Sequence, residues 1–243
     1  MASMTGHRIL SGTDARLRIA PWRGDSRTAH VTPARGRPTP AAIERAVAEL
    51  SSGHYAVAVT AALPPLEQRP FLDAGFEVHE RLHLLVRTLD DVPPWAVAPA
   101  DLRRGHLADR SDLLRLDAAA FPRFWQLDND SLDDALAATP SARLRVAIGH
   151  REPRPLLGYA ITGRAGPRGY LQRLAVDPPA QRAGIGANLV VDGLRWLRRW
   201  GAKEVLVNTQ EGNDDAVGLY ERLGFRLQPG GLAVLRRDFG EAS

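Results

Sequence analysis

The segment from residue 169 to residue 209 constrains the fold of this chain more than any other part of it. Residues 169–176 and 204–209 have the alternating or β-branched pattern of strands, whereas residues 186–200 carry one apolar stripe with the period of a helix. A strand, a helix and a second strand in this order predict that the chain forms a mixed α/β sheet covered by helices.

Further elements on both sides of this segment extend the pattern. We expect additional helices over residues 40–50, 66–74, 107–121, 131–138 and 215–223, with Ser131 as the N-cap of the fourth. We expect additional strands over residues 55–60, 82–87, 142–148, 156–162 and 232–236. The C-terminal part therefore has antiparallel strands first and strand–helix–strand units later, which is typical of a mixed α/β sandwich.

A proline-rich stretch divides the chain. Residues 90–101 contain three prolines and break every periodicity, as linkers do. We therefore expect a first domain over residues 1–89, a linker over 90–101 and a second domain over 102–243, because both parts have plausible domain sizes.

The two parts resemble each other in the order of their elements. At an offset of 149 residues several side chains agree as well: Thr60 with Thr209, Phe71 with Tyr220, and Gly75-Phe76 with Gly224-Phe225. This agreement predicts an internal duplication, in which the first part is a shorter, partial copy of the second.

Composition and charge exclude several classes of protein. The chain has no cysteine, so disulfides, thiolate metal sites and a cysteine nucleophile are excluded, and we expect no metal. The net charge is only +4 and the arginines are scattered, which disfavours a nucleic-acid partner.

The start of the chain and its apolar runs bear on its location. No apolar run approaches the roughly 18 residues that cross a bilayer, and the first ten residues lack the apolar region of a secretory signal. We therefore expect a cytoplasmic protein without a membrane partner. The first six residues resemble an expression leader.

Gly184 and Gly186 lie between the strand that ends at Val176 and the helix that follows. Glycines at the start of a helix let backbone N–H groups approach an anion, and the helix N-terminus stabilises its charge, so a pyrophosphate would suit this loop. The chain has no Gly-Lys-Ser/Thr triplet, and position 189 is Leu, which excludes a Walker loop and a dinucleotide fingerprint. From these glycines alone, a tight strand-to-helix turn remains the alternative.

Two motifs around this loop resemble the signatures of the GCN5-related N-acetyltransferase (GNAT) family. The run Gln-Arg-Ala-Gly-Ile-Gly-Ala at residues 181–187 is similar to the family's acetyl-CoA signature, and the preceding Leu-Ala-Val-Asp-Pro at 174–178 to its usual strand ending. Further on, Asn213, Ala216 and residues 219–225 resemble the family's second signature, in the expected order. The resemblance spans residues 105–239.

This resemblance implies a GNAT fold with a smaller, degenerate GNAT-like domain before it, and direct transfer of the acetyl group of acetyl-CoA to a primary amine. It implies that Asn213 binds the pantetheine arm and that the Tyr220 hydroxyl protonates the departing thiolate as general acid. Packing against the sheet is the alternative for Tyr220. The resemblance also implies that the backbone at Leu174, Ala175 and Val176 pairs with pantetheine, and that the amides of Arg182, Ala183, Gly184, Ile185, Gly186 and Ala187 hold the pyrophosphate.

The general base, the acceptor amine and the oligomeric state stay open at this point. The strand at 169–176 lacks the glutamate that some family members carry there, which leaves Glu211, Asp128, Asp130 or a water chain as the base. Candidates for the acceptor wall are Gln172, Arg173, Asn208, Thr209, Gln210 and the aromatic loop 121–128.

The first domain lacks the residues that the resemblance assigns to the site of the second. We expect the first domain to be structural, because Phe71 stands at the position of Tyr220 and residues 32–38 lack paired glycines. A non-catalytic acyl-CoA-binding or regulatory module is the alternative function.

Overall fold

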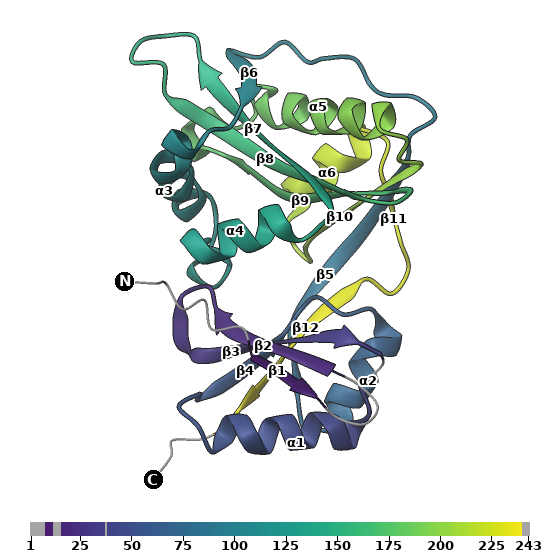
Figure 1. The fold of residues 1–243 in the computed structure, drawn as a ribbon. Helices are drawn as coiled ribbons and strands as arrows, with labels where there is room; N and C mark the ends of the chain where they lie inside the picture. Colours follow the sequence, from purple (N-terminus) through teal and green to yellow (C-terminus); the bar gives the residue numbers. More distant parts are fainter. Residues whose placement is uncertain (1–7, 12–15, 37, 240–243) are drawn as a thin grey trace. The chain divides into compact units, whose positions relative to one another are not determined.

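The computed structural model describes residues 8–11, 16–36 and 38–239, and Figure 1 shows its elements. The first six residues, which resemble an expression leader, lie outside this described part. The chain forms two compact units: the first comprises Met1–His83, Gln210–Gly212 and Pro229–Ser243, and the second comprises Leu84–Thr209 and Asn213–Gln228. Among the described residues, no helix is both long and apolar enough to cross a membrane.

The first unit contains a mixed sheet and two helices. Its strands follow the order β1-β2-β3-β4-β12-β5, and β3 and β4 run parallel because α1 connects them. The apolar face of α1 packs with Phe71 and Phe76 in one buried cluster. The elements are β1 (Arg8–Ser11), β2 (Arg16–Trp22), β3 (Asp25–Arg35), α1 (Pro40–Ser51), β4 (Val57–Thr60), α2 (Pro65–Asp73), the first part of β5 (Glu77–Thr88) and β12 (Leu232–Asp238).

The second unit contains a larger mixed sheet with helices on both faces. Its strands follow the order β5-β10-β9-β8-β7-β6, with β11 paired to β5. Residues of α5 and α6 share one buried cluster, and residues of α3 and α4 share another. The elements are β6 (Ala100–Arg104), α3 (Arg110–Ala120), α4 (Asn129–Ala137), β7 (Ser141–Gly149), β8 (Leu156–Ala165), β9 (Arg168–Val176), α5 (Ile185–Arg199), β10 (Glu204–Gln210), α6 (Asp214–Arg222) and β11 (Arg226–Leu227), with short 3-10 turns at Leu107–Asp109, Arg123–Trp125 and Pro178–Ala180.

The two units repeat one order of elements. In the first unit it is β3-α1-β4-α2, and in the second it is β9-α5-β10-α6, with the two strands parallel in each case. Helix α2 (Pro65–Asp73) and helix α6 (Asp214–Arg222) have the same length and lie at the offset of 149 residues that the sequence indicated. This repeated order supports the predicted duplication.

The chain does not pass from the first unit to the second at residues 90–101, where the sequence indicated a linker. Strand β5 begins in the first unit and ends in the second, and β12 lies in the first unit although it follows the elements of the second. The proline-rich segment 90–101, expected to link two domains, connects β5 with β6 inside the second unit. Prolines indicate an irregular backbone, but they do not indicate which sheet each flanking strand joins.

Two local features also differ from expectation. The sequence pattern does not indicate β2 and β3, which form an antiparallel hairpin, because Pro21 and Pro33 interrupt it. The N-cap of α4 is Asp128 and not Ser131: the Asp128 carboxylate accepts from the Ser131 N–H at 2.9 Å. Ser131 is instead the third residue of the helix, from which its hydroxyl bonds back to Asp128.

His30 on β3 makes the stability of the first unit dependent on pH. Burial, together with the charges of Arg23 and Arg18, lowers the pKa of His30 to about 4. Its Nε2 is buried without a hydrogen-bond partner in the described structure, and its ring packs edge-on against Trp22 at 4.9 Å. The folded state therefore favours the neutral imidazole.

We expect the protein to lose stability as the pH falls from about 6.5 to about 4. In this range His30 is protonated in the unfolded chain but stays neutral in the folded chain, so protonation favours the unfolded state. The loss is on the order of 3 kcal/mol below the lower value and is absent above the upper one. Thermal unfolding across this range measures it. His30→Phe keeps a ring against Trp22, so this variant should lose less stability over the same range than the parent chain.

Candidate functional site

Strands β9 and β10 run parallel and separate where the site begins. Their register covers Arg168 to Tyr170 on β9 and Glu204 to Leu206 on β10. Beyond Tyr170, β9 continues to Val176 in register with β8. This leaves the far half of β9 outside the register with β10, so its edge can receive an extended ligand as an added strand.

The backbone alternation of β9 decides which residues face this gap. The Asp177 N–H donates to the Leu157 carbonyl at 2.9 Å, so Asp177 faces β8, and Ala175 faces the same way. Leu174 and Val176 therefore turn their backbone groups toward the gap. Of the three strand residues that the sequence indicated, Leu174 and Val176 can pair with a ligand, whereas Ala175 is engaged with β8.

A bulge in β9 lies beside the separation of the strands. The register between β8 and β9 shifts so that Ile161 is opposite Arg173 and Thr162 is opposite Leu171. Gln172 is the extra residue of β9, and its Oε1 is buried without a hydrogen-bond partner in the described structure. Because a bulge bends and twists its strand, this one contributes to the divergence of β9 from β10.

The loop that leads into α5 has the conformation of an anion-binding turn. Arg182 and Gly184 both have left-handed backbones, with φ of 64° and 80°. Gly184 is the N-cap of α5, and no side chain caps the helix. The first backbone N–H groups of α5 are therefore available to an anion at the positive end of the helix. The Arg182 side chain pairs with Asp215 of α6.

The two glycines of this loop have different roles. A Cβ on Gly184 would lie 2.7 Å from the Val97 carbonyl oxygen, and the φ of 80° already disfavours any side chain. A Cβ on Gly186 would meet Leu219 and Val176 at 3.5 Å, an ordinary contact. Gly184 is thus required by the fold of the loop, whereas an alanine fits at Gly186.

Asn213 holds the start of α6. As the N-cap, its side chain accepts from the Ala216 N–H at 3.3 Å and donates to Thr209 Oγ1 at 2.9 Å. These bonds join the end of β10 to the first turn of α6, and they fix the helix that carries Tyr220. The structure therefore gives Asn213 a structural task beside the binding role that the resemblance implies.

Tyr220 lies in the last turn of α6, in the same buried cluster as residues of α5. It is 5% exposed, and its ring packs against Phe225 at 5.6 Å. Burial raises the pKa of Tyr220 above its ordinary value, because the phenolate would lose its hydration. The hydroxyl therefore keeps its proton at neutral pH, which is the state that a general acid needs.

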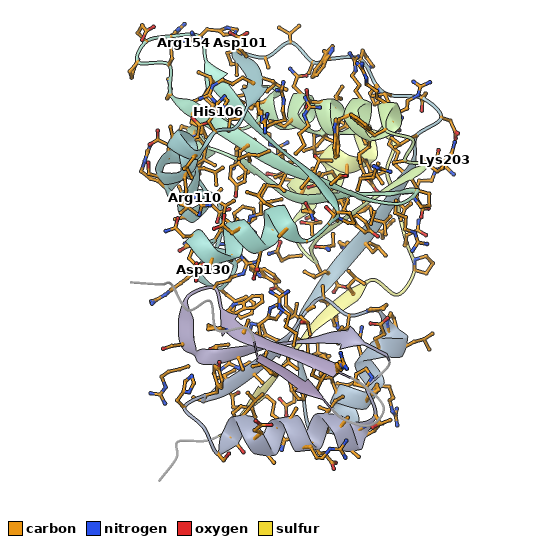
Figure 2. The ribbon with its side chains drawn as sticks, in the orientation of Figure 1. Asp101, His106, Arg110, Asp130, Arg154 and Lys203 are labelled. Atoms are coloured by element: carbon orange, nitrogen blue, oxygen red, sulfur yellow. The ribbon has the colours of Figure 1, made fainter. Side chains whose placement is uncertain are left out.

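The three candidate bases lie in different surroundings. The Asp128 carboxylate is occupied as the N-cap of α4. Asp130, labelled in Figure 2, is an exposed residue of the first turn of α4. Glu211 belongs to the first unit, where its N–H donates to the Arg81 carbonyl.

The candidate acceptor wall is only partly available. Arg173 and Thr209 are engaged in bonds within the second unit, and Gln210 belongs to the first unit. Asn208 remains exposed on β10. Arg173 and Thr209 are therefore less accessible to an acceptor than Asn208, because Asp117 and Asn213 hold their side chains.

A buried polar network that the sequence analysis did not identify lies on the α3 face of the sheet. Asp117 of α3 is 0% exposed and accepts from Arg173 Nε and Nη2 at 2.8 Å each. It also accepts from the Tyr159 hydroxyl and, at 2.7 Å, from the Leu127 N–H. Arg173 Nη2 donates in addition to the Trp125 carbonyl at 2.7 Å. The network thus ties the aromatic loop 121–128 to β9. The sequence carries one signal of this network: Asp117 lies four residues after Leu113, on the apolar stripe of α3, where an acid requires a buried partner.

We expect Asp117→Ala to lower the free energy of unfolding by about 3 kcal/mol, because it leaves the buried guanidinium of Arg173 without its partner. Asp112→Ala on the same helix is the matched control. Its partner Arg115 is exposed, so this change should cost less than about 1 kcal/mol. Denaturant unfolding of both variants measures the difference, and equal losses would contradict the importance given to the buried pair.

Comparison with known sequences finds similarity to acetyltransferases. Residues 110–225 match the acetyltransferase (GNAT) family. Over 172 residues the chain is 32% identical to a mycothiol acetyltransferase of Mycobacteroides abscessus, covering 67% of this chain and 58% of that relative. It is 28% identical to a mycothiol acetyltransferase of Nocardioides sp. over 90% of this chain and 79% of that one. The chain thus spans less than two thirds of the Mycobacteroides abscessus relative.

Solved structures show the same fold at low sequence identity. A tandem GNAT protein from the clavulanic acid biosynthesis pathway has a TM-score of 0.69 at 15% identity, over 96% of this chain and 82% of that one. A GCN5-related N-acetyltransferase from Sphaerobacter thermophilus has a TM-score of 0.63 at 15% identity, over 93% of this chain and 76% of that one. Both likenesses extend over both units.

Proposed function

Because this chain belongs to the GNAT superfamily, we propose that it transfers the acetyl group of acetyl-CoA directly to a primary amine. One observation of the structure supports this most: in a single unit, the divergence of β9 and β10 lies next to an uncapped helix start with left-handed turns at Arg182 and Gly184. An open strand edge and a phosphate loop side by side suit a ligand that carries both an amide-containing arm and a pyrophosphate.

The residues present fit acetyl-CoA. The backbone groups of Leu174 and Val176 would pair with the pantetheine arm, and the amides from Arg182 to Ala187 would hold the pyrophosphate. Asn213 would add a hydrogen bond to pantetheine through its second Nδ2 hydrogen, because only one of the two is donated to Thr209. Acetyl-CoA itself supplies the activated acetyl thioester.

The transfer needs two proton movements. The attacking amine must be neutral, and it forms a bond to the thioester carbon while the carbon–sulfur bond breaks. Tyr220, which keeps its proton because it is buried, would give that proton to the departing thiolate. The proton of the amine would leave through water or an exposed acid. Asp117 does not suit this task, because Arg173 and Tyr159 occupy its carboxylate.

The first unit would be structural. Phe71 occupies the position that corresponds to Tyr220, is fully buried and has no hydroxyl. The helix α1, which corresponds to α5, is capped by Thr39, whose hydroxyl accepts from the Ala42 N–H at 3.3 Å. Its start is therefore less available to a phosphate than the uncapped start of α5.

The acceptor would be a small-molecule amine, since the relatives above are named mycothiol acetyltransferases. The test is release of free coenzyme A thiol from acetyl-CoA, with a panel of amino sugars, polyamines, aminoglycosides and lysine peptides. Binding of coenzyme A without thiol release in any mixture would favour the second candidate function, a non-catalytic acyl-CoA-binding module. The absence of a carboxylate on β9, Arg168–Val176, is the observation that favours that alternative.

A further inference from the structure

An irregular segment of the second unit runs along α5 and reaches its first turn. We name residues 92–98, between β5 and β6, the strap. It begins with Val92 and the pair Pro93-Pro94, which restricts the backbone to extended conformations. Val92 and Ala98, at its two ends, pack against the cluster that contains α5. The strap is therefore part of the packed structure.

Three contacts fix the strap on α5. The guanidinium of Arg195 lies over the ring of Trp95 at 4.5 Å, a cation–π contact. The Asn188 side chain forms two hydrogen bonds with the backbone of Ala96. The Ala96 N–H donates to Asn188 Oδ1 at 2.7 Å, and Asn188 Nδ2 donates to the Ala96 carbonyl at 2.9 Å. Asn188 is only 8% exposed, so both of these bonds are protected from water.

The next residue of the strap borders the phosphate loop. The Val97 carbonyl lies so close to Gly184 that a Cβ there would be 2.7 Å away. Asn188, which holds the strap, lies one turn into α5, where its own N–H donates to the Gly184 carbonyl at 3.1 Å. Strap and loop are thus anchored to one turn of one helix. The Val97 side chain is 99% exposed, so it is accessible to a ligand.

We propose that the strap is the outer wall of the acetyl-CoA phosphate site, with Val97 as a ligand-contacting residue and Asn188 as the positioning residue. This inference rests on the proposed function. A wall of neutral backbone and one aliphatic side chain beside an anion site limits the access of water without adding negative charge. The positive electrostatic potential at the N-terminus of α5 then acts on the phosphates without competition from a charged side chain of the strap.

Val97→Asp tests the proposal, because a fully exposed side chain can change without disturbing the core. The new carboxylate should weaken binding of coenzyme A about three- to tenfold at low ionic strength, and the effect should shrink in salt. The matched control is Leu107→Asp, which adds the same charge at another residue of the unit that is 82% exposed. The control should bind coenzyme A like the parent chain in calorimetry.

Asn188→Ala supplies a second and independent measurement. It removes both bonds to Ala96, so hydrogen exchange at residues 95–98 should accelerate and coenzyme A should bind more weakly. In this background Val97→Asp should lose most of its effect, because the released strap no longer holds the charge beside the loop.

The outcomes separate the two proposals. A parent chain that does not bind coenzyme A would overturn the proposed function. A parent chain that binds, with equal affinities for Val97→Asp and Leu107→Asp, would overturn the strap inference and leave the proposed function standing. If Asn188→Ala does not fold, the comparison of the two aspartate variants decides alone.

Discussion

We expect Gly184→Glu to abolish binding of acetyl-CoA, with a loss in affinity of about a thousandfold or more. The φ of 80° at this residue disfavours every side chain by about 1–2 kcal/mol, and a Cβ would collide with the Val97 carbonyl. The carboxylate adds repulsion toward a pyrophosphate and would compete with it for the amides at the start of α5. Calorimetric titration with acetyl-CoA measures the effect.

Gly186→Ala is the matched control in the same loop. Its added Cβ would make only ordinary contacts at 3.5 Å from Leu219 and Val176, so acetyl-CoA should bind within about threefold of the parent affinity. Circular dichroism and thermal unfolding show whether each variant is folded. A folded Gly184→Glu protein with unchanged affinity would remove the loop from the site.

Tyr220→Phe is expected to slow acetyl transfer while acetyl-CoA still binds with nearly the parent affinity. General acids contribute about 100- to 10,000-fold, and the loss should lie toward the lower end because the coenzyme A thiolate is a fairly good leaving group. Since burial raises the pKa of Tyr220, its ionisation should not lower the rate as the pH rises to the ordinary tyrosine value of about 10. Single-turnover rates with an amine found in the thiol-release panel measure the step, so that slow product release does not mask it.

Tyr170→Phe provides the comparison, because it deletes the same atom from another tyrosine of the second unit, on β9. Its single-turnover rate should equal that of the parent chain. Phe71 of the first unit shows that phenylalanine packs without difficulty at the equivalent helix position, so Tyr220→Phe should fold. A parent-like rate for Tyr220→Phe would leave solvent as the source of the proton.

The sequence by itself determined the parts of the site whose physics is local. The glycine loop could be predicted at residues 184–186, since glycine adopts the left-handed backbone found at Gly184 more easily than any other residue. The helical periodicity of α5 and α6 follows from patterns within a few turns of chain, whereas Asn213 and Tyr220 were identified through the resemblance to the family's second signature. The repeated order of elements was readable for the same reason.

The tertiary structure alone decided which distant segments pair. The patterns of residues 82–87 and 232–236 predict strands, but they do not indicate that β12 pairs with β4 and β5, because many strands would satisfy the same pattern. Likewise, Asp117 on an apolar stripe requires a partner, yet only the packing of α3 against β8 and β9 selects Arg173 and Tyr159. The position of the strap on Asn188 depends on contacts across 92 residues of chain, which no local pattern specifies.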